Sequence, residues 1–126
     1  MLSSEKQDLK IETKYPDVEI VDIQYCESDP LKAVEQATNM INAEPELKGI
    51  WGVSGNSTVG IANAVSELNK VGEIFVVDFD NIEPVITALE SGIIQAIAVQ
   101  MPSRMGAESV QTIIHIIMAI TQILKK

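Results

Sequence analysis

The sequence predicts an α/β fold built around a parallel sheet. Apolar runs rich in β-branched residues alternate along the chain with segments whose apolar residues recur at helical spacing. The runs are apolar at nearly every position, as in strands that helices cover on both faces. The connections are short, which favours right-handed crossovers within one open sheet. We therefore expect each strand to lead directly into a helix.

The expected strands come first, because they fix the sheet. An acidic segment of weak pattern, residues 1–17, precedes them, with Leu9 and Ile11 as hints of the end of a helix. The four expected strands run from Val18 to Tyr25, Gly49 to Val53, Ile74 to Phe79 and Ile93 to Val99.

The first expected helix has a clear start signal. Asp29 offers a capping carboxylate directly before Pro30, which suits the first helical turn. The helix should end at about Ala43. Its apolar residues share one face: Leu31, Val34, Ala37 and Ile41.

Three further helices are expected. Asn56 should cap the second helix, which should end at Gly72. Asn81 should cap a shorter third helix, with Gly92 just past its end. The final helix, Ser103–Leu124, is apolar on almost every side. The whole order is β-α-β-α-β-α-β-α.

Composition limits the class of function. The chain has 126 residues, which fits one compact domain, and its 9 basic and 18 acidic residues give a net charge of −9. This acidic balance argues against nucleic acid and anionic membranes as partners. The single Cys26 permits no internal disulfide, one histidine supports no zinc site, and no cofactor is implied. Residues 1–8 lack the apolar stretch of a secretory signal peptide.

Polar residues at the strand ends are the candidate binding residues. In an open parallel sheet, ligands bind beyond the carboxyl ends of the strands. Hydroxyl, amide and carboxylate groups there suit a neutral polyhydroxylated ligand, and a carboxylate such as Asp80 accepts hydrogen bonds from two hydroxyls at once. Helix caps and turns use the same residue types, so this pattern alone leaves both interpretations open. The candidates are Ser54, Asn56, Asp80 and Gln100.

No catalytic residue is predicted, and we expect the chain not to be an enzyme. The run Ile74–Asp80 resembles the strand-DxD of haloacid-dehalogenase phosphatases, but no aspartate follows it and the only later lysines are Lys125 and Lys126. The turn Gly52–Ser57 lacks the lysine and the glycine spacing of a phosphate-binding loop. A receiver domain would need a lysine near the last strand end, where this chain has Gln100.

Several stretches together resemble the second half of ribose-type sugar-binding proteins, the solute receptors of ABC importers with the type I periplasmic-binding fold. The similarity covers about Tyr15 to Ile117. LacI-type regulator effector domains share the fold but usually carry a threonine-rich block in place of Gln-x-Pro, so the regulator is the alternative. The matching stretches are 29–33, 50–52, 60–64, 76–80 and, most specifically, 91–106.

The resemblance implies a partial lobe, a three-layer sandwich with a parallel sheet, followed by an apolar helix. In the family, the residues at these two positions bind sugar hydroxyls, so the resemblance assigns this role to Asp80 and Gln100. The family's ligand-binding Asn-Asp falls on Ser54-Gly55, and Asn56 is a candidate to replace the missing amide. The family's Gly-Phe-Asp becomes Asp78-Phe79-Asp80, which adds a carboxylate at residue 78 that we expect to face solvent. No metal is implied.

The resemblance also implies boundaries and partners. Residues 1–101 would be part of the C-terminal lobe, and residues 102–126 a helix that crosses to the other lobe. The lobe's first strand, central in the family's sheet, would precede Ser3. We therefore expect an open sheet edge and an unpartnered apolar helix, either of which favours a homo-oligomer or a self-associating module. The expected partners are a sugar and, in the intact parent, an ABC permease, in a periplasmic or extracytoplasmic location.

Overall fold

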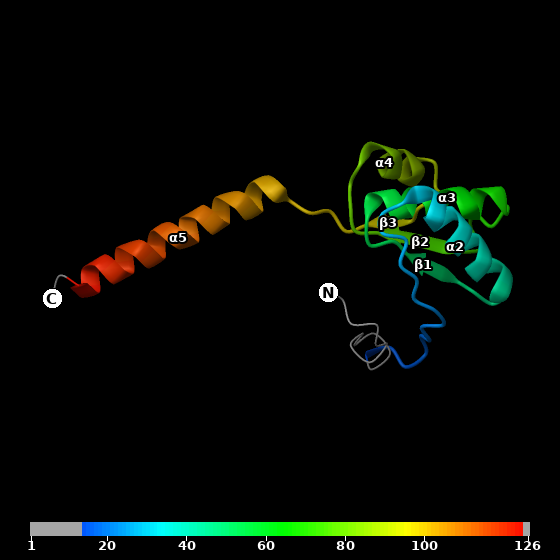
Figure 1. The fold of residues 1–126 in the computed structure, drawn as a ribbon, viewed down its shortest axis with the longest axis horizontal. Coiled ribbons are helices and arrows are strands. Elements are labelled where there is room, and N and C mark those ends of the chain that lie inside the picture. The colour runs from blue at the N-terminus through cyan, green and yellow to red at the C-terminus, as the bar shows by residue number, and fades with distance from the viewer. Residues whose placement is uncertain (1–13, 125–126) are drawn as a thin grey trace.

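The described part of the chain is an α/β lobe followed by a long projecting helix (Figure 1). The computed structural model describes residues 14–124. Within them, β1 (Gly49–Trp51), β2 (Phe75–Asp78) and β3 (Ala96–Ile97) form a parallel sheet in the order β1-β2-β3. The α/β class and the parallel sheet are confirmed. The helices are α2 (Pro30–Ala43), α3 (Gly55–Glu67), α4 (Glu83–Glu90) and α5 (Pro102–Leu124).

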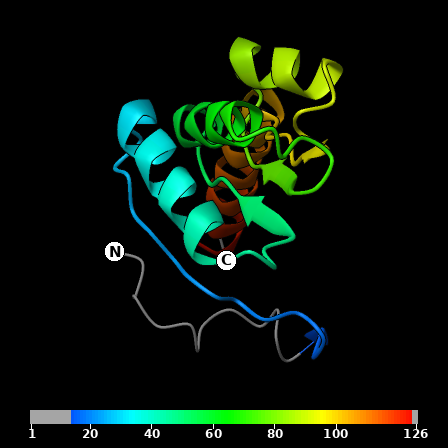
Figure 2. The same ribbon diagram turned by 90° about the vertical axis from the view of Figure 1, so that its right-hand side faces the viewer.

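Residues 18–25 form no strand, so the first expected strand is wrong. The segment runs as an extended chain outside the sheet (Figure 2), and most of its residues are exposed. A strand exists only through a ladder of backbone hydrogen bonds to a neighbour. In the described residues that ladder stops at β1, which is an edge strand. An apolar run becomes a strand only where it joins such a ladder, whatever its propensity.

The helices cover one face of the sheet. In β2, Val76 and Asp78 are buried, whereas Phe75 and Val77 are 55% and 38% exposed. Trp51 of β1 is 51% exposed. Burial on both faces, expected from the unbroken apolar runs, is therefore wrong for the described residues, which supply the sheet and one helical layer. The buried core consists of Ala37, Ile41, Ile61, Ala62, Ala64, Val65, Ile74, Val76, Val85 and Ile94.

The start of α2 is as predicted. An Asp29 carboxylate oxygen accepts hydrogen bonds from the backbone N–H groups of Leu31 and Lys32, at 2.9 and 3.3 Å. The helix packs closely on α3 at Gly60, where a Cβ atom would lie 2.4 Å from the Pro30 carbonyl oxygen. Glycine at residue 60 therefore sets the spacing of these two helices.

Both ends of α3 differ from the prediction. Its N-cap is Ser54, which forms a capping box with Ser57, and Asn56 lies inside the first turn. The helix ends before Gly72, because Asn69 adopts a left-handed conformation with φ 56°. The Lys70 N–H then bonds the Val65 carbonyl at 2.8 Å, which completes a Schellman motif.

The end of α4 is as predicted, but its start is not. Gly92 has φ 78°, and the Ile93 N–H bonds the Ala88 carbonyl at 2.9 Å. At the other end the N-cap is Ile82, with no side-chain cap, so Asn81 does not cap the helix. Proline in the first turn removes one N–H group that a cap would satisfy.

β3 is shorter than the expected 93–99 run. The Ile94 N–H bonds the Ala88 carbonyl at 3.2 Å, so it belongs to the end of α4. Gln95 bonds Val76 twice: its backbone N–H donates to the Val76 carbonyl at 2.9 Å, and its side-chain Oε1 accepts from the Val76 N–H at 2.7 Å. The paired positions of β3 begin at Ala96, which lies opposite Val77.

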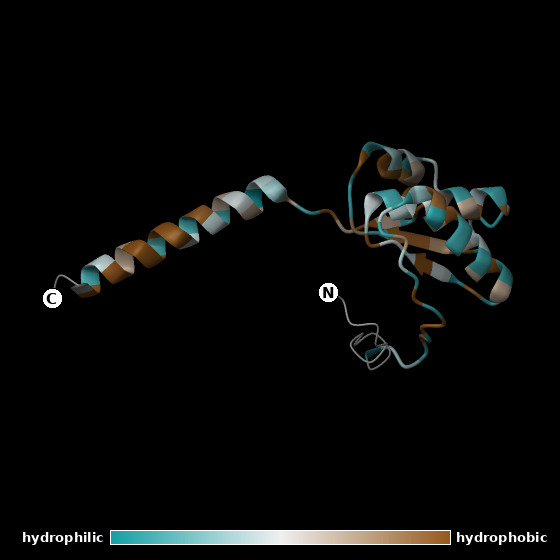
Figure 3. Ribbon diagram, viewed as in Figure 1, coloured by the Kyte–Doolittle hydropathy of each residue, from teal (hydrophilic) through white to brown (hydrophobic). Residues whose placement is uncertain are grey.

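α5 projects away from the sheet and its helical layer (Figures 1 and 3). It begins at Pro102, one residue before the expected Ser103, and every residue from Pro102 to Ile123 is exposed. Hydrophobic residues recur along its length (Figure 3). Neither α5 nor another helix within residues 14–124 has the length and apolar character needed to cross a membrane.

Candidate functional site

The sheet topology brings the predicted site residues to one edge. Because β1, β2 and β3 are parallel neighbours, the segments that follow them leave the sheet at the same side. Ser54 follows β1, Asp80 follows β2 and Gln100 follows β3. We call these three residues and Asn56 the rim. That the rim contacts a ligand stays a prediction.

The hydroxyl of Ser54 is largely occupied by the start of α3. Its Oγ lies 2.9 Å from the Ser57 Oγ, and the Ser57 Oγ donates to the Ser54 carbonyl at 2.7 Å. Ser28, in the turn before α2, reaches the same point, with its Oγ 3.3 Å from the Ser54 Oγ. Ser54 therefore acts first as a helix cap, and Ser28 extends the polar surface beside it.

Asp80 is half-buried in the loop between β2 and α4. Its Oδ1 accepts from the Asn81 N–H at 3.0 Å, while its Oδ2 makes no hydrogen bond within the described residues. The loop lies against the start of α3, because a Cβ atom on Gly55 would come 2.7 Å from the Ile82 side chain. The Asp80 loop and the Ser54 turn are thus adjacent parts of one edge.

Asn56 and Gln100 are exposed, and neither side chain makes a hydrogen bond within residues 14–124. Each amide offers one acceptor oxygen and two N–H donors to a ligand. β3 is tied to β2 by the Ala98 N–H, which bonds the Asp78 carbonyl at 2.9 Å. This bond holds the chain just before Gln100 at the rim.

Asp78 lies beneath the rim and is only 2% exposed, so its expected exposure to solvent is wrong. Thr58 is fully buried, and its Oγ1 donates to the Asp78 Oδ1 at 2.5 Å. The Thr58 Oγ1 also lies 3.0 Å from the Ser54 carbonyl. Asp78 Oδ2 is buried and has no hydrogen-bond partner within the described residues. The pair connects the end of β2 to the first turn of α3, directly below the rim.

Sequence reasoning missed Ser28 and the pairing of Thr58 with Asp78. Ligands of an open parallel sheet bind beyond the carboxyl ends of its strands, and we call this the strand-end rule. Ser28 follows the apolar run 18–25, so the rule applied to that run would have identified Ser28. The pairing had no local signal, because the two residues are separated by 20 positions along the chain. It became visible only when β2 and α3 were placed side by side.

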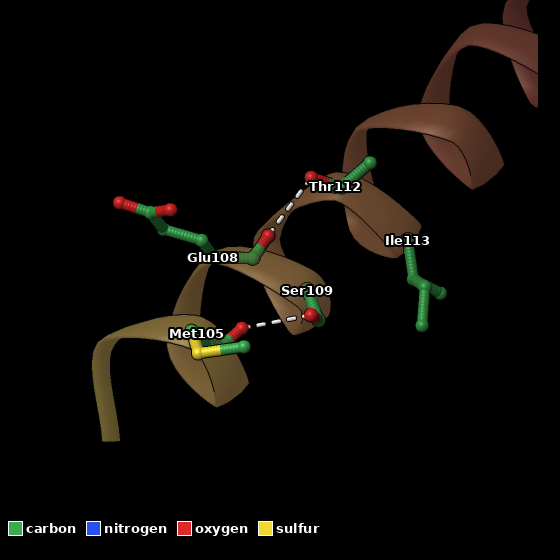
Figure 4. A pocket seen from close by; sticks show the side chains of 5 residues that line it. All are labelled: Met105, Glu108, Ser109, Thr112 and Ile113. Carbon is green, nitrogen blue, oxygen red and sulfur yellow. Dashed lines mark hydrogen bonds between the residues drawn. The ribbon is translucent and has the colours of Figure 1, made fainter. Parts of the chain in front are cut away.

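Two surface hollows lie along α5 and the residue before it. One is lined by residues of this single helix: Met105, Glu108, Ser109, Thr112 and Ile113 (Figure 4). Its hydroxyls are used internally, since Ser109 donates to the Met105 carbonyl at 2.7 Å and Thr112 to the Glu108 carbonyl at 2.8 Å. Residues 14–124 contain no group of three acidic, His or Cys side chains placed to hold a metal ion.

Comparison with known proteins finds sugar-binding proteins among those to which the chain is similar. The D-allose-binding periplasmic protein of Escherichia coli K12 is 29% identical over 101 residues, which cover 80% of this chain and 32% of that protein. The D-ribose/D-allose-binding protein of Pseudomonas aeruginosa is 26% identical over 100 residues, 79% of this chain and 31% of that protein. The chain therefore spans about a third of the length of these relatives.

Solved structures of sugar-binding proteins are similar to the chain as well. The arabinose-binding protein of Geobacillus stearothermophilus is 31% identical with a TM-score of 0.64, over 67% of this chain and 29% of that one. A carbohydrate transporter solute-binding protein of Agrobacterium radiobacter, bound to D-arabinose, is 26% identical with a TM-score of 0.69. The match covers 85% of this chain and 36% of that one. These relatives favour the transport receptor over the LacI-type regulator. The family model described as periplasmic binding protein domain matches residues 5–119, and the chain belongs to this family.

Proposed function

We propose that this chain is part of the C-terminal lobe of the sugar-binding component of an ABC importer, and that its rim is half of a ligand cleft. In this proposal residues 1–101 belong to the lobe, and residues 102–126 form the helix that crosses to the other lobe. The chain acts by binding and carries no catalytic activity. The observation that supports this most is the convergence of the Ser54, Asp80 and Gln100 segments at one edge of the sheet, in a chain whose relatives are sugar-binding proteins.

The chemistry of the rim fits a neutral sugar. Asp80 keeps one carboxylate oxygen without a hydrogen bond in the described residues, and it is half-buried, which strengthens its bonds to hydroxyl donors. Asn56 and Gln100 add exposed amides that both donate and accept. Ser54 contributes less than the family's asparagine, because its hydroxyl caps α3. We therefore expect Asp80 to dominate binding.

The relatives suggest the ligand and the setting. The names of the two curated relatives state that they bind D-allose or D-ribose, and one is called periplasmic. We propose a sugar of this class as the ligand, an ABC permease as the partner of the intact parent, and an extracytoplasmic location. A half-site leaves the other face of the sugar in water, so binding by this chain alone should be weak.

Calorimetric titration of D-allose and D-ribose into the chain tests this proposal. We expect a dissociation constant above about 1 mM, because half of the contacts are missing. Asp80→Ala should abolish the binding. The control Glu90→Ala removes an exposed carboxylate at the far end of α4 and should change nothing. Binding that survives Asp80→Ala contradicts the proposal that the rim binds the sugar. A dissociation constant below about 1 mM contradicts the proposal that the chain holds only half of the site.

A further inference from the structure

The turn before α2 brings a second hydroxyl to the rim. Ser28 is exposed, and its Oγ lies 3.3 Å from the Ser54 Oγ, although the two residues are 26 positions apart in the chain. The contact forms because α2 and α3 pack side by side (Figure 2), so the turns that lead into them are neighbours. Since the Ser54 turn also adjoins the Asp80 loop, Ser28 borders the same edge of the lobe.

The backbone of this turn holds Ser28 in an unusual conformation. The Asp29 N–H donates to the Cys26 carbonyl at 2.9 Å, and the two residues between them, Glu27 and Ser28, have φ 56° and 61°. Two consecutive positive φ values without glycine are unfavourable in an isolated chain. Such conformations persist where the surrounding structure fixes them, and they are concentrated at binding sites. Here the contact with Ser54 and the Asp29 cap of α2 fix the turn.

The Ser54 hydroxyl is fully used within the described residues. A serine hydroxyl has one proton to donate and two lone pairs that accept. The Ser57 Oγ donates its proton to the Ser54 carbonyl at 2.7 Å, so Ser54 is the donor in the 2.9 Å contact between the two hydroxyls. The lone pairs of the Ser54 Oγ accept from the Ser57 N–H at 3.4 Å and from Ser28. Ser54 therefore keeps no donor and no acceptor for a ligand.

The Ser28 hydroxyl is the outer end of this chain of hydrogen bonds. Its proton goes to the Ser54 Oγ, because the Ser54 proton is already donated to Ser57. Its two lone pairs accept no hydrogen bond within residues 14–124, and the residue is exposed. Ser28 can therefore accept a hydrogen bond from a ligand hydroxyl but has no proton left to donate.

We propose that Ser28, and not Ser54, supplies the hydroxyl that contacts the ligand at this part of the rim, as an acceptor for one sugar hydroxyl. This inference rests on the proposed function, because it needs a polyhydroxylated ligand at the rim. The Asp80 carboxylate, which also only accepts, borders the same edge. Ser28 and Asp80 together select a ligand that presents hydroxyl donors at two positions.

Two glycine variants of the same turn test this role. Ser28→Gly removes the hydroxyl, whereas the control Glu27→Gly keeps it, and each puts glycine at a position of positive φ. Both variants should therefore unfold at the urea concentration of the wild-type chain or at a higher one. In NMR titrations with D-allose and D-ribose, we expect Ser28→Gly to raise the dissociation constant at least about threefold. Glu27→Gly should change it less than about twofold.

The outcomes separate this inference from the proposed function. Binding that Asp80→Ala abolishes and Ser28→Gly leaves unchanged overturns the role of Ser28 alone. Equal weakening by both glycine variants also overturns it, since the effect would then come from the backbone of the turn. If the wild-type chain binds neither sugar, or if binding survives Asp80→Ala, the proposed function falls and this inference falls with it.

Sugar analogues test the direction of the hydrogen bond. Among deoxy derivatives of D-allose, the one that lacks the hydroxyl bound by Ser28 should bind the wild-type chain about threefold more weakly than D-allose. Ser28→Gly should weaken this derivative no further. The fluoro derivative at the same position cannot donate, so it should bind like the deoxy sugar. A fluoro derivative that binds as tightly as D-allose overturns the acceptor role, and so does a series in which Ser28→Gly weakens every derivative.

Discussion

The residue with the greatest consequence below the rim is Thr58, because it provides the hydrogen bond to a buried carboxylate. One oxygen of Asp78 accepts a hydrogen bond from the Thr58 Oγ1 at 2.5 Å, and the other has no partner in the part of the chain that the structure describes. A buried charged group that loses its partner costs more than the lost bond itself. The pair therefore stabilises the junction of β2 and α3 and, through it, the position of the rim.

Thr58→Val removes this hydroxyl while keeping the shape of the side chain. We expect a loss of about 2–4 kcal/mol in the free energy of unfolding, because the Asp78 carboxylate is left buried without a donor. Urea unfolding followed by fluorescence of the single tryptophan, Trp51, measures it. Thr87→Val is the control, because the exposed Thr87 hydroxyl only donates to the Glu83 carbonyl of its own helix. Equal effects of the two variants would refute the role of the buried pair.

At the scale of elements, the start of α3 gives different roles to Ser54 and Asn56, which the sequence placed together as candidate binding residues. The capping box uses Ser54 and Ser57, whereas Asn56 is exposed and makes no hydrogen bond within the described residues. An N-cap side chain satisfies a backbone N–H that the helix itself cannot. The stability of α3 should thus depend on Ser54, which leaves Asn56 free for a ligand.

Ser54→Ala and Asn56→Ala make this distinction measurable. Loss of the Ser54 cap should cost about 1 kcal/mol in the free energy of unfolding, and Asn56→Ala should change it by less than about 0.5 kcal/mol. Thermal or urea unfolding of both variants under the same conditions provides the comparison. A larger loss for Asn56→Ala than for Ser54→Ala would return the cap to Asn56, as the sequence pattern alone indicated.

Local signals explain why much of the fold could be predicted. Asp29 before Pro30 located the start of α2, and Gly92 located the end of α4, because caps depend on a few neighbouring residues. Failures came where the outcome depends on distant chain. Residues 18–25 have strand composition but do not join the described sheet. Asn56 lost the cap to Ser54, which sequence alone could not rank above it.

At the scale of the whole molecule, the described chain is a lobe with one covered face. Trp51, Phe75 and Val77 lie on the uncovered face of the sheet, and β1 has an open edge. The rim needs neither of these surfaces, because it is built by the segments that leave β1, β2 and β3 on the carboxyl side. The polar residue types and their edge were predictable from the strand-end rule, whereas the burial of Asp78 needed the packed structure.

The most direct test of the account is amide NMR mapping of the chain with saturating D-allose. We predict chemical-shift changes at Ser54, Asn56, Asp80 and Gln100, with the Asp80 loop most affected, and none at the hollow on α5. This result would locate the sugar at the carboxyl edge of the sheet. Shifts confined to the hollow on α5, or no shifts at sugar concentrations of about 100 mM, would contradict the account, since even a half-site of weak affinity is occupied there.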